Sequence, residues 1–222
     1  MAVGLECLGK INDECICEVL LMAAESLKVL SDSAILDISN LDILSRIIDT
    51  CDVSGEIEEK ITACIGEKNL HGLSRICDEN GIDGQKKALL QKLITIYGNP
   101  EDVIGELEEV FYDLGDGLSE EARNLYSDSI RKLVMIVDAF EGTGLEDMLR
   151  IDFSVVSDLK YYNGIIFKGF VEGIPDGVLS GGQYDKLMDN MNRTSRAIGF
   201  AVYMDYLGKL PKFDGEEVVI RG

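Results

Sequence analysis

The chain has 222 residues, of which 46% are hydrophobic and 28% charged, a balance typical of a globular protein with a buried core. Its 41 Asp and Glu residues outnumber its 21 Lys and Arg residues, and the formal net charge of −20 disfavours nucleic acid and anionic membrane surfaces as partners. The chain contains neither an apolar run of about 18 residues nor the basic and apolar start of a signal peptide, so we expect a cytoplasmic protein.

The first 50 residues predict a strand, a helix, a second strand and a second helix. A short strand over residues 4–9 precedes a helix capped by Asn12 or Asp13, whose apolar residues recur at helical spacing as far as Leu30. SAILDISN then alternates apolar and polar residues as a strand does, and LDILSRIIDT returns to the helical period.

Six cysteines and one histidine offer little scope for a disulfide framework or a metal site. A chain of this size has its own core, so reduced thiols are expected. Cys15 and Cys17 form a C-x-C within a helical pattern, where residues two apart point in different directions, and no second cysteine pair or histidine pair follows. His71 falls in a predicted surface helix. We therefore predict neither a metal nor a cofactor.

The middle of the chain, residues 51–144, has helical spacing almost throughout. We predict three to five short helices, forming a bundle-like insertion between two parts of a core, residues 1–50 and 145–222. The acidic run over residues 101–121 is predicted to be a solvated helical face, with an acidic docking surface as the alternative. Turn signals interrupt the helical pattern at Asn80-Gly81, Gly98-Asn99-Pro100 and Gly115-Asp116-Gly117.

Beyond residue 144 the pattern changes to short runs rich in Ile, Val and Phe. MLRIDFSVV predicts one strand, and NGIIFKGFVEGIPDGVLSGG predicts an antiparallel pair whose loop carries Pro175-Asp176-Gly177, a favourable turn sequence. YDKLMDNM should be a helix, RAIGFAV a strand, YMDYLGKL a helix ending near Gly208, and EEVVIRG a last strand.

Four segments resemble, in the same order, the catalytic core of the histidyl-tRNA synthetase family. They are GLECLG at residues 4–9, DLKYYNGIIF at 158–167, LSGGQYDKL at 179–187 and RAIGFAVYMDYL at 196–207. Each motif is short, but four in register form a fairly specific match. The resemblance implies an α+β fold of the class II aminoacyl-tRNA synthetase type, an antiparallel sheet flanked by helices, with a helical insertion.

The resemblance also implies a pocket the size of an amino acid. Glu6 matches the family's glutamate that meets the ammonium or imidazole of the amino acid, whereas the family's glutamine four residues earlier would fall at Ala2. The alternatives from local pattern alone are an exposed acid on a strand, a tyrosine pair split between core and surface, and glycines that form a bulge or tight turn. The predicted histidine pocket consists of Glu6, the aromatic walls Tyr161, Tyr162 and Tyr184, and the closely approaching backbone of Gly181 and Gly182.

Three arginines of the synthetase pattern are replaced in this chain. Ser157, within Ser157-Asp158-Leu159-Lys160, stands where the family has the arginine of Arg-Gly-Leu-Asp. Tyr206 stands where Glu-Arg-Leu has its arginine, and Gln183 replaces the arginine of Gly-Gly-Arg-Tyr-Asp. Activating an amino acid on ATP builds negative charge that fixed cations stabilise. We therefore expect the site not to activate histidine.

The family includes a synthetase-like protein that charges no tRNA, the regulatory subunit of ATP phosphoribosyltransferase. With its three arginines replaced, this chain resembles that member of the family. The resemblance implies a non-catalytic subunit of a hetero-oligomer with the short catalytic form of that enzyme, and L-histidine as a candidate ligand. Such a subunit is required for activity and for histidine feedback control in the first step of histidine biosynthesis.

Two alternatives remain open. One is a fragment of a divergent histidyl-tRNA synthetase that activates histidine with ATP, and the other is a ligand sensor or scaffold for an unrelated system. The match begins at the family's second motif and ends about where its anticodon-binding domain would begin. We accordingly expect a version of the family truncated at its N-terminus.

Overall fold

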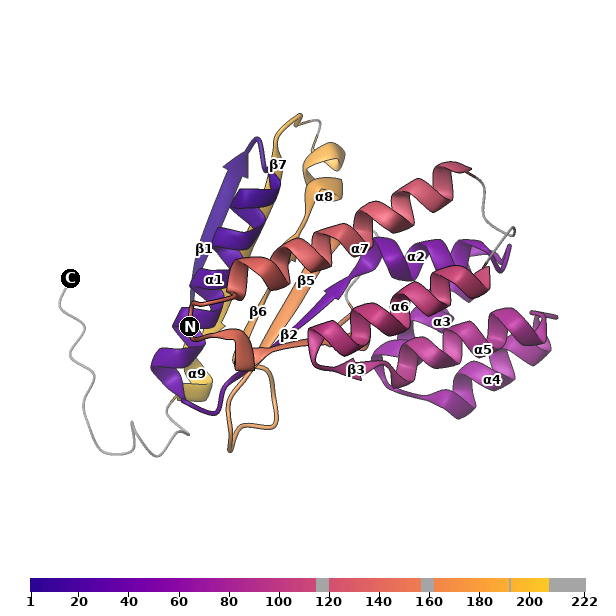
Figure 1. Ribbon diagram of the computed structural model, residues 1–222, viewed down its shortest axis with the longest axis horizontal. Helices are drawn as coiled ribbons and strands as arrows, with labels where there is room; N and C mark the ends of the chain where they lie inside the picture. Colours follow the sequence, from indigo (N-terminus) through magenta and orange to yellow (C-terminus); the bar gives the residue numbers. More distant parts are fainter. Residues whose placement is uncertain (115–119, 157–161, 192, 208–222) are drawn as a thin grey trace.

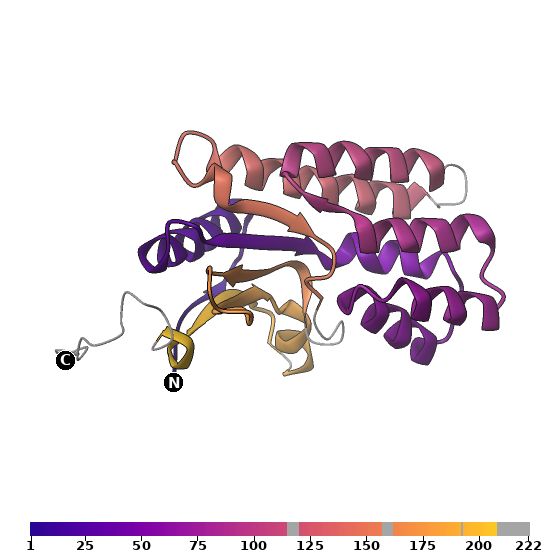
Figure 2. The ribbon, with the colours of Figure 1, turned by 90° about the horizontal axis from the view of Figure 1, so that it is seen from below.

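The computed structural model describes residues 1–114, 120–156, 162–191 and 193–207. Within these residues, seven strands form one sheet in the order β1-β7-β6-β5-β2-β4-β3. Most of the sheet lies at one end of an elongated molecule and a group of helices lies at the other, as Figure 1 and Figure 2 show. The predicted α+β class, with a class II synthetase-like sheet and a helical insertion, is confirmed.

The sheet is antiparallel apart from one pair. β2 and β4 run parallel, because the long helical segment between them crosses over before the chain returns to the sheet. β1 and β3 form the two edges. The strands are β1 Ala2–Gly9, β2 Ile35–Asn40, β3 Tyr97–Gly98, β4 Leu149–Asp152, β5 Asn163–Phe170, β6 Leu179–Gln183 and β7 Arg196–Tyr203.

The helices fall mainly between β2 and β4, and the expected helix before β2 and the two after β6 are also present. A 3₁₀ turn, Glu146–Met148, precedes β4. The helices are α1 Asp13–Leu30, α2 Leu41–Asp49, α3 Gly55–Gly66, α4 Leu70–Glu79, α5 Gly84–Thr95, α6 Pro100–Leu114, α7 Glu120–Phe140, α8 Asp185–Asn190 and α9 Met204–Leu207.

Helix α1 begins at the predicted cap and packs on the sheet. The Asn12 side chain accepts a hydrogen bond from the backbone N–H of Cys15 at 3.0 Å, which satisfies one of the free donors of the first turn. The apolar face ends at Leu27, whose methyl groups lie so close to β5 that a Cβ added to Gly169 would approach them to 2.6 Å. Figure 1 shows α1 and α7 lying over the strands.

The predicted helical insertion contains five helices among the described residues, α3 to α7. The last two are not short, since α6 has 15 residues and α7 has 21. In α6 the acidic side chains from Glu101 to Glu109 are exposed while Val103, Leu107 and Val110 are buried. A solvated face and an acidic docking surface both fit this exposure, so the choice between them stays a prediction. Because α7 contacts α1 and α2, and β3 joins the sheet through β4, the proposed boundaries of the insertion remain a prediction.

The strand predicted over MLRIDFSVV is too long. β4 ends at Asp152, whose carboxylate accepts a hydrogen bond from the backbone N–H of Ser154 at 2.7 Å and thereby turns the chain. The predicted turn at residues 115–117 and the predicted strand EEVVIRG lie outside the described residues. No helix of the described part of the chain is both long and apolar enough to cross a membrane.

The contact between α1 and β5 predicts a strong dependence of stability on Leu27. Leu27→Ala should lower the free energy of unfolding by about 2–5 kcal/mol, because it removes a fully buried side chain and leaves a cavity between α1 and β5. Met22→Ala, at an exposed position of the same helix, is the control and should change it by less than about 1 kcal/mol. Urea unfolding of both variants measures this, and equal losses would contradict the proposed packing.

Candidate functional site

One face of the sheet is covered by α1 and α7, and the candidate site lies on the opposite, open face. Across this open face one row of residues joins four neighbouring strands as direct Cα partners. The row runs from Glu6 on β1 to Gly199 on β7, then to Gly182 on β6 and Ile166 on β5. Two adjacent glycines in the middle of the row leave a flat stretch of backbone, the glycine floor, made of Gly182 and Gly199.

The glycine floor has no room for side chains. A Cβ on Gly199 would lie 2.4 Å from the carbonyl oxygen of Leu5 and 3.1 Å from the carboxyl carbon of Glu6. A Cβ on Gly182 would lie 2.7 Å from the side chain of Ile166. Gly181, by contrast, faces the covered side, where its Cβ would meet Phe167 at 2.5 Å. Sequence reasoning therefore missed Gly199, which only the register of β7 against β1 and β6 places in the floor.

Glu6 lies at the edge of the glycine floor. It is an exposed side chain on an edge strand, and partial burial raises the pKa of its carboxyl group. The structure thus places Glu6 and Gly182 in one row, as a shared pocket requires. Glu6 does not line the cavity described below.

The predicted aromatic walls are only partly described. Tyr162 and Tyr184 are half-buried and form an edge-to-face pair, with ring centroids 6.4 Å apart and planes at 81°. Tyr161 and Ser157 lie outside the described residues, so the predicted place of each stays a prediction.

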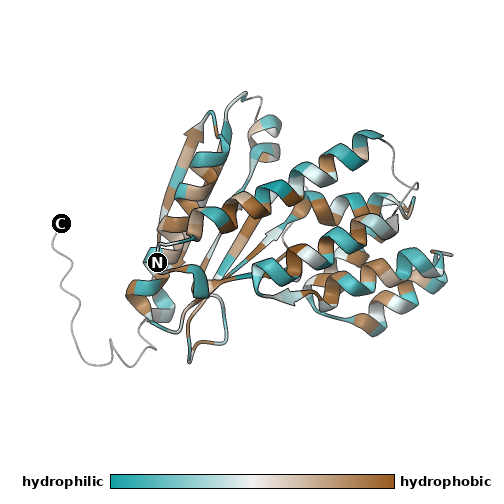
Figure 3. Cartoon of the chain, viewed as in Figure 1, coloured by the Kyte–Doolittle hydropathy of each residue, from teal (hydrophilic) through white to brown (hydrophobic). Residues whose placement is uncertain are grey.

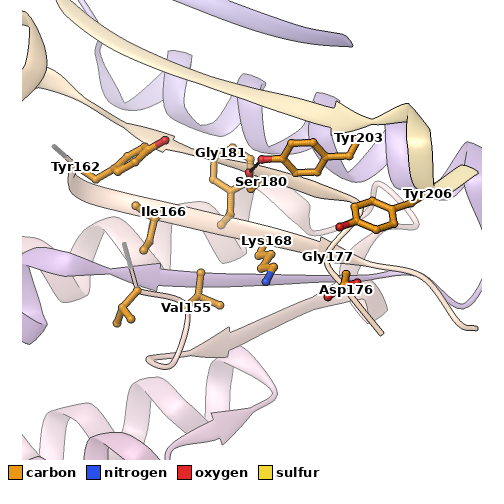
Figure 4. Close-up of a pocket in the computed structure, with 12 residues that line it drawn as sticks. Val155, Tyr162, Ile166, Lys168, Asp176, Gly177, Ser180, Gly181, Tyr203 and Tyr206 are labelled. Carbon is orange, nitrogen blue, oxygen red and sulfur yellow. Dashed lines mark hydrogen bonds between the residues drawn. The ribbon is translucent and has the colours of Figure 1, made fainter. Parts of the chain in front are cut away.

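A cavity of about 390 Å³ opens on this face of the sheet, as Figure 4 shows. That volume lies within the range of small-molecule sites. Tyr162 and Gly181 are the two predicted pocket residues that line it, Gly181 through its backbone alone because its Cβ position points to the covered side. The remaining lining residues are Val155, Val156, Ile166, Phe167, Lys168, Asp176, Gly177, Ser180, Tyr203 and Tyr206.

Two further tyrosines form one wall of the cavity. Tyr203 ends β7 and Tyr206 lies in α9, and their rings meet edge to face with centroids 6.3 Å apart. The hydroxyl groups of Tyr203 and Ser180 are hydrogen-bonded at 2.6 Å, which fixes the ring of Tyr203 against β6. Tyr206, at the position of a family arginine, therefore gives the cavity an aromatic ring where the synthetase pattern has a cation.

The other polar residues of the glycine-rich motif hold strands together. Gln183 is buried, and its side-chain oxygen accepts a hydrogen bond from the backbone N–H of Ile165 at 2.9 Å, beside the bulge where Gly164 has φ +59°. Asp185 accepts from the backbone N–H of Ala197 at 3.0 Å and from the side chain of Asn163 at 3.2 Å. Neither Gln183 nor Asp185 lines the cavity.

A buried acid lies next to the cavity on β2. Asp37 is the Cα partner of Lys168, is only 7% exposed, and its Oδ1 atom has no hydrogen-bond partner. Burial and the charge of Asp152 raise the pKa of Asp37 to about 7, against the opposing effect of nearby cations. Asp152 itself is paired with Lys68 at 2.8 Å.

The described residues contain no group of three or more His, Cys, Asp and Glu side chains that could hold a metal ion. All six cysteines are free thiols, and Cys17, Cys64 and Cys77 are buried. His71 lies exposed on α4, as predicted.

The histidyl-tRNA synthetase family model matches residues 1–207 of the chain. ATP phosphoribosyltransferase regulatory subunits from Acetivibrio thermocellus and Alkaliphilus metalliredigens are 28% and 27% identical to it over 200 and 207 residues. These alignments cover 90% and 93% of this chain but 45% and 50% of the two relatives. The chain therefore spans about half the length of the curated relatives it matches.

Solved structures show the same fold. A histidine–tRNA ligase subunit from Alicyclobacillus acidocaldarius superposes with a TM-score of 0.79 at 22% identity, covering 97% of this chain and 65% of that one. An ATP phosphoribosyltransferase regulatory subunit/histidyl-tRNA synthetase from Bacillus halodurans superposes with a TM-score of 0.78 at 22% identity, covering 95% of this chain and 53% of that one. A chain of the ATP phosphoribosyl transferase (HisG:HisZ) complex from Thermotoga maritima superposes with a TM-score of 0.64 at 19% identity, covering 91% of this chain and 65% of that one.

A mixed sheet with one helix-covered face, and a small-ligand cavity on the other, defines an α+β protein of the class II aminoacyl-tRNA synthetase type. Since the family model spans nearly the whole chain, the chain belongs to the histidyl-tRNA synthetase family.

The glycine floor predicts that Gly199→Ala destabilises the sheet. The added methyl group meets a backbone oxygen that cannot rotate away, so the free energy of unfolding should fall by about 1–3 kcal/mol. Gly55→Ala is the control, because a Cβ there meets nothing within 4 Å. Thermal unfolding compares the two variants, and unchanged stability of Gly199→Ala would contradict the observed register of β1 and β7.

The raised pKa of Asp37 predicts that this residue destabilises the folded protein more at high pH than at low pH. An acid with a raised pKa binds more protons in the folded than in the unfolded state between about pH 4 and pH 7, so its contribution to stability falls as pH rises through that window. Asp37→Asn removes this effect. Measured against the parent protein, the free energy of unfolding of the variant should rise by about 1–3 kcal/mol as the pH is raised from 4.5 to 8. Urea unfolding at the two pH values measures the gain, and a pH-independent difference would contradict the raised pKa.

Proposed function

We propose that this chain is the synthetase-like part of a non-catalytic regulatory subunit of ATP phosphoribosyltransferase. Its curated relatives carry that name, and one solved relative is part of an ATP phosphoribosyl transferase complex. In this proposal the subunit assembles with the short catalytic subunit into a cytoplasmic hetero-oligomer. The assembly is required for activity in the first step of histidine biosynthesis.

The observation that carries the proposal is the chemistry of the cavity. Its lining keeps the size and aromatic character of an amino-acid site, but among the described residues Lys168 is its only cation. Transfer of an adenylyl group needs several fixed cations around the reacting phosphate. Tyr206 and Gln183 supply none, and Gln183 is turned into the sheet. The site is therefore suited to binding a ligand and poorly suited to activating one.

Feedback control follows if the ligand is L-histidine. The proposed contacts are those that the family pattern assigns to Glu6, Tyr161, Tyr162, Gly181, Gly182 and Tyr184. A bound amino acid changes the activity of a partner subunit only if it binds two states of the assembly with different affinity. The hetero-oligomer must accordingly have an active state and a second state that histidine prefers.

The proposal predicts activation without synthetase chemistry. Full-length protein added to the purified short catalytic subunit should raise phosphoribosyl transfer at least tenfold, and L-histidine should then reduce it. The same preparation should show no histidine-dependent exchange of pyrophosphate into ATP, because Lys168 is the single cation in the described lining of its cavity. A histidyl-tRNA synthetase is the positive control for exchange. Robust exchange, or failure to activate the catalytic subunit, would overturn the proposal.

A further inference from the structure

Two cysteine side chains meet at the junction between β1 and α1. Cys7 lies near the end of β1 and Cys15 lies in the first turn of α1, and Figure 1 shows this helix lying over the strand. Only residues 10–12 connect the two elements, so α1 turns back directly along β1. The thiols of Cys7 and Cys15, here called the junction pair, are hydrogen-bonded to each other.

Strand geometry directs Cys7 to the helix-covered face of the sheet. Glu6 lies on the open face, and neighbours in a strand point to opposite faces. Accordingly, Cys7 is half-buried and packs against the core, whereas Glu6 and Leu8 are exposed. Cys15 is half-buried as well, and its backbone N–H donates to the side chain of Asn12 at 3.0 Å, which fixes the first turn of α1. Each thiol is therefore held against the other and stays within reach of small solutes.

The other cysteines have different surroundings. Cys17 is buried, and its thiol donates to the carbonyl oxygen of Met135 on α7 at 3.9 Å. Cys64 and Cys77 are buried in the core, and the half-buried Cys51 donates its thiol to a carbonyl oxygen of α2 at 3.8 Å. The junction pair thus combines partial solvent access with a contact between two thiols.

This contact decides how the junction pair reacts with an oxidant. Burial, the neighbouring Cys15 and the charge of Glu18 raise the pKa of Cys7, so its first oxidation step is slow at neutral pH and becomes faster as the pH rises. A sulfenic acid on either cysteine then meets the second thiol at once. Two groups held in contact react far faster than the same groups free in solution.

We propose that the junction pair is a site of reversible oxidation, at which hydrogen peroxide converts the thiols of Cys7 and Cys15 into a disulfide. In the first step one thiolate sulfur attacks a peroxide oxygen, the S–O bond forms as the O–O bond breaks, and the leaving hydroxide takes up the thiol proton to give water. In the second step the other sulfur attacks the sulfenic sulfur, the S–S bond forms as the S–O bond breaks, and a second water leaves with the remaining thiol proton. The two thiols lose two electrons to the peroxide, and a dithiol such as dithiothreitol returns them.

The disulfide ties an edge strand to the helix that covers it. Cys7 directly follows Glu6, so the bridge fixes the backbone at the margin of the glycine floor. The inference is independent of the proposed function, because the two thiols lie on the covered face of the sheet and outside the lining of the cavity.

The test is peptide mapping by mass spectrometry of the full-length protein, treated with hydrogen peroxide and then alkylated at its remaining thiols. Trypsin cleaves after Lys10, so the bridge should appear as two joined peptides that separate after treatment with dithiothreitol. Fragment spectra distinguish Cys15 from Cys17, which share a peptide. Cys17→Ser, two residues away on the same helix, is the matched control and should retain the bridge.

Single variants of the junction pair give a second readout. Without its partner the sulfenic acid persists, so dimedone should label Cys7 in Cys15→Ser, or Cys15 in Cys7→Ser, at least about tenfold more than in the parent protein. Circular dichroism and thermal unfolding verify that each variant is folded.

Three outcomes would overturn the inference. They are both junction thiols remaining open to alkylation in the treated parent protein, a bridge that includes Cys17 in place of Cys15, and dimedone labelling that does not increase in either single variant. Activation of the catalytic subunit is measured separately, so the proposed regulatory role stands or fails independently of these results.

Discussion

The close approach of α1 to β5 decides which face of the sheet can hold a ligand. Leu27 fills the space above Gly169 so completely that a side chain at that glycine has no room. With α1 fixed there, and α7 beside it, one face of the sheet is buried and forms the core. Figure 3 shows how apolar the strands and the inward sides of the helices are. The polar side chains of alternate strand positions must then point to the other face, where the cavity lies.

The open face combines a flat backbone with a reduced set of charges. Gly182 and Gly199 leave the backbone of β6 and β7 without side chains on this face. Tyr203 and Tyr206 form an aromatic wall of the cavity on the same face. In the proposed function, a site with rings and few cations holds a small polar molecule and does not stabilise the charge that develops on a phosphorus during adenylation. Two of the residues that depart from the synthetase pattern have defined positions in the structure. Gln183 supports the bulge of β5, and Tyr206 lines the cavity.

Much of the fold follows from local patterns in the sequence. Asn12 caps α1 as expected because its side chain has a backbone donor within reach, and the apolar period of that helix continues to its last turn. The strand at MLRIDFSVV was predicted too long, because a local hydrogen bond from Ser154 to Asp152 competes with the ladder and ends β4. The parallel pairing of β2 and β4 also lay beyond local pattern, since it depends on a crossover through the whole helical segment.

The site was less predictable than the fold. Tyr162 and Gly181 line the cavity as expected, but Lys168, Asp176 and Tyr203 have no motif that marks them. Gly181 and Gly182 are adjacent glycines that the sequence does not distinguish, yet Gly181 faces the core and Gly182 belongs to the glycine floor on the open face. A shift of one residue in register would exchange the two faces, and register is fixed by partners distant in the chain.

The sequence by itself determined most element types and the acidic surface, because these are properties of composition and short-range periodicity, and its resemblance to the synthetase motifs marked the replaced arginines. Only the tertiary structure decided that Glu6 lies outside the cavity and that Lys168 and Asp176 share one. The physical reason is that strand pairing brings residues from β1, β5, β6 and β7 together across a sheet whose order differs from the order of the chain.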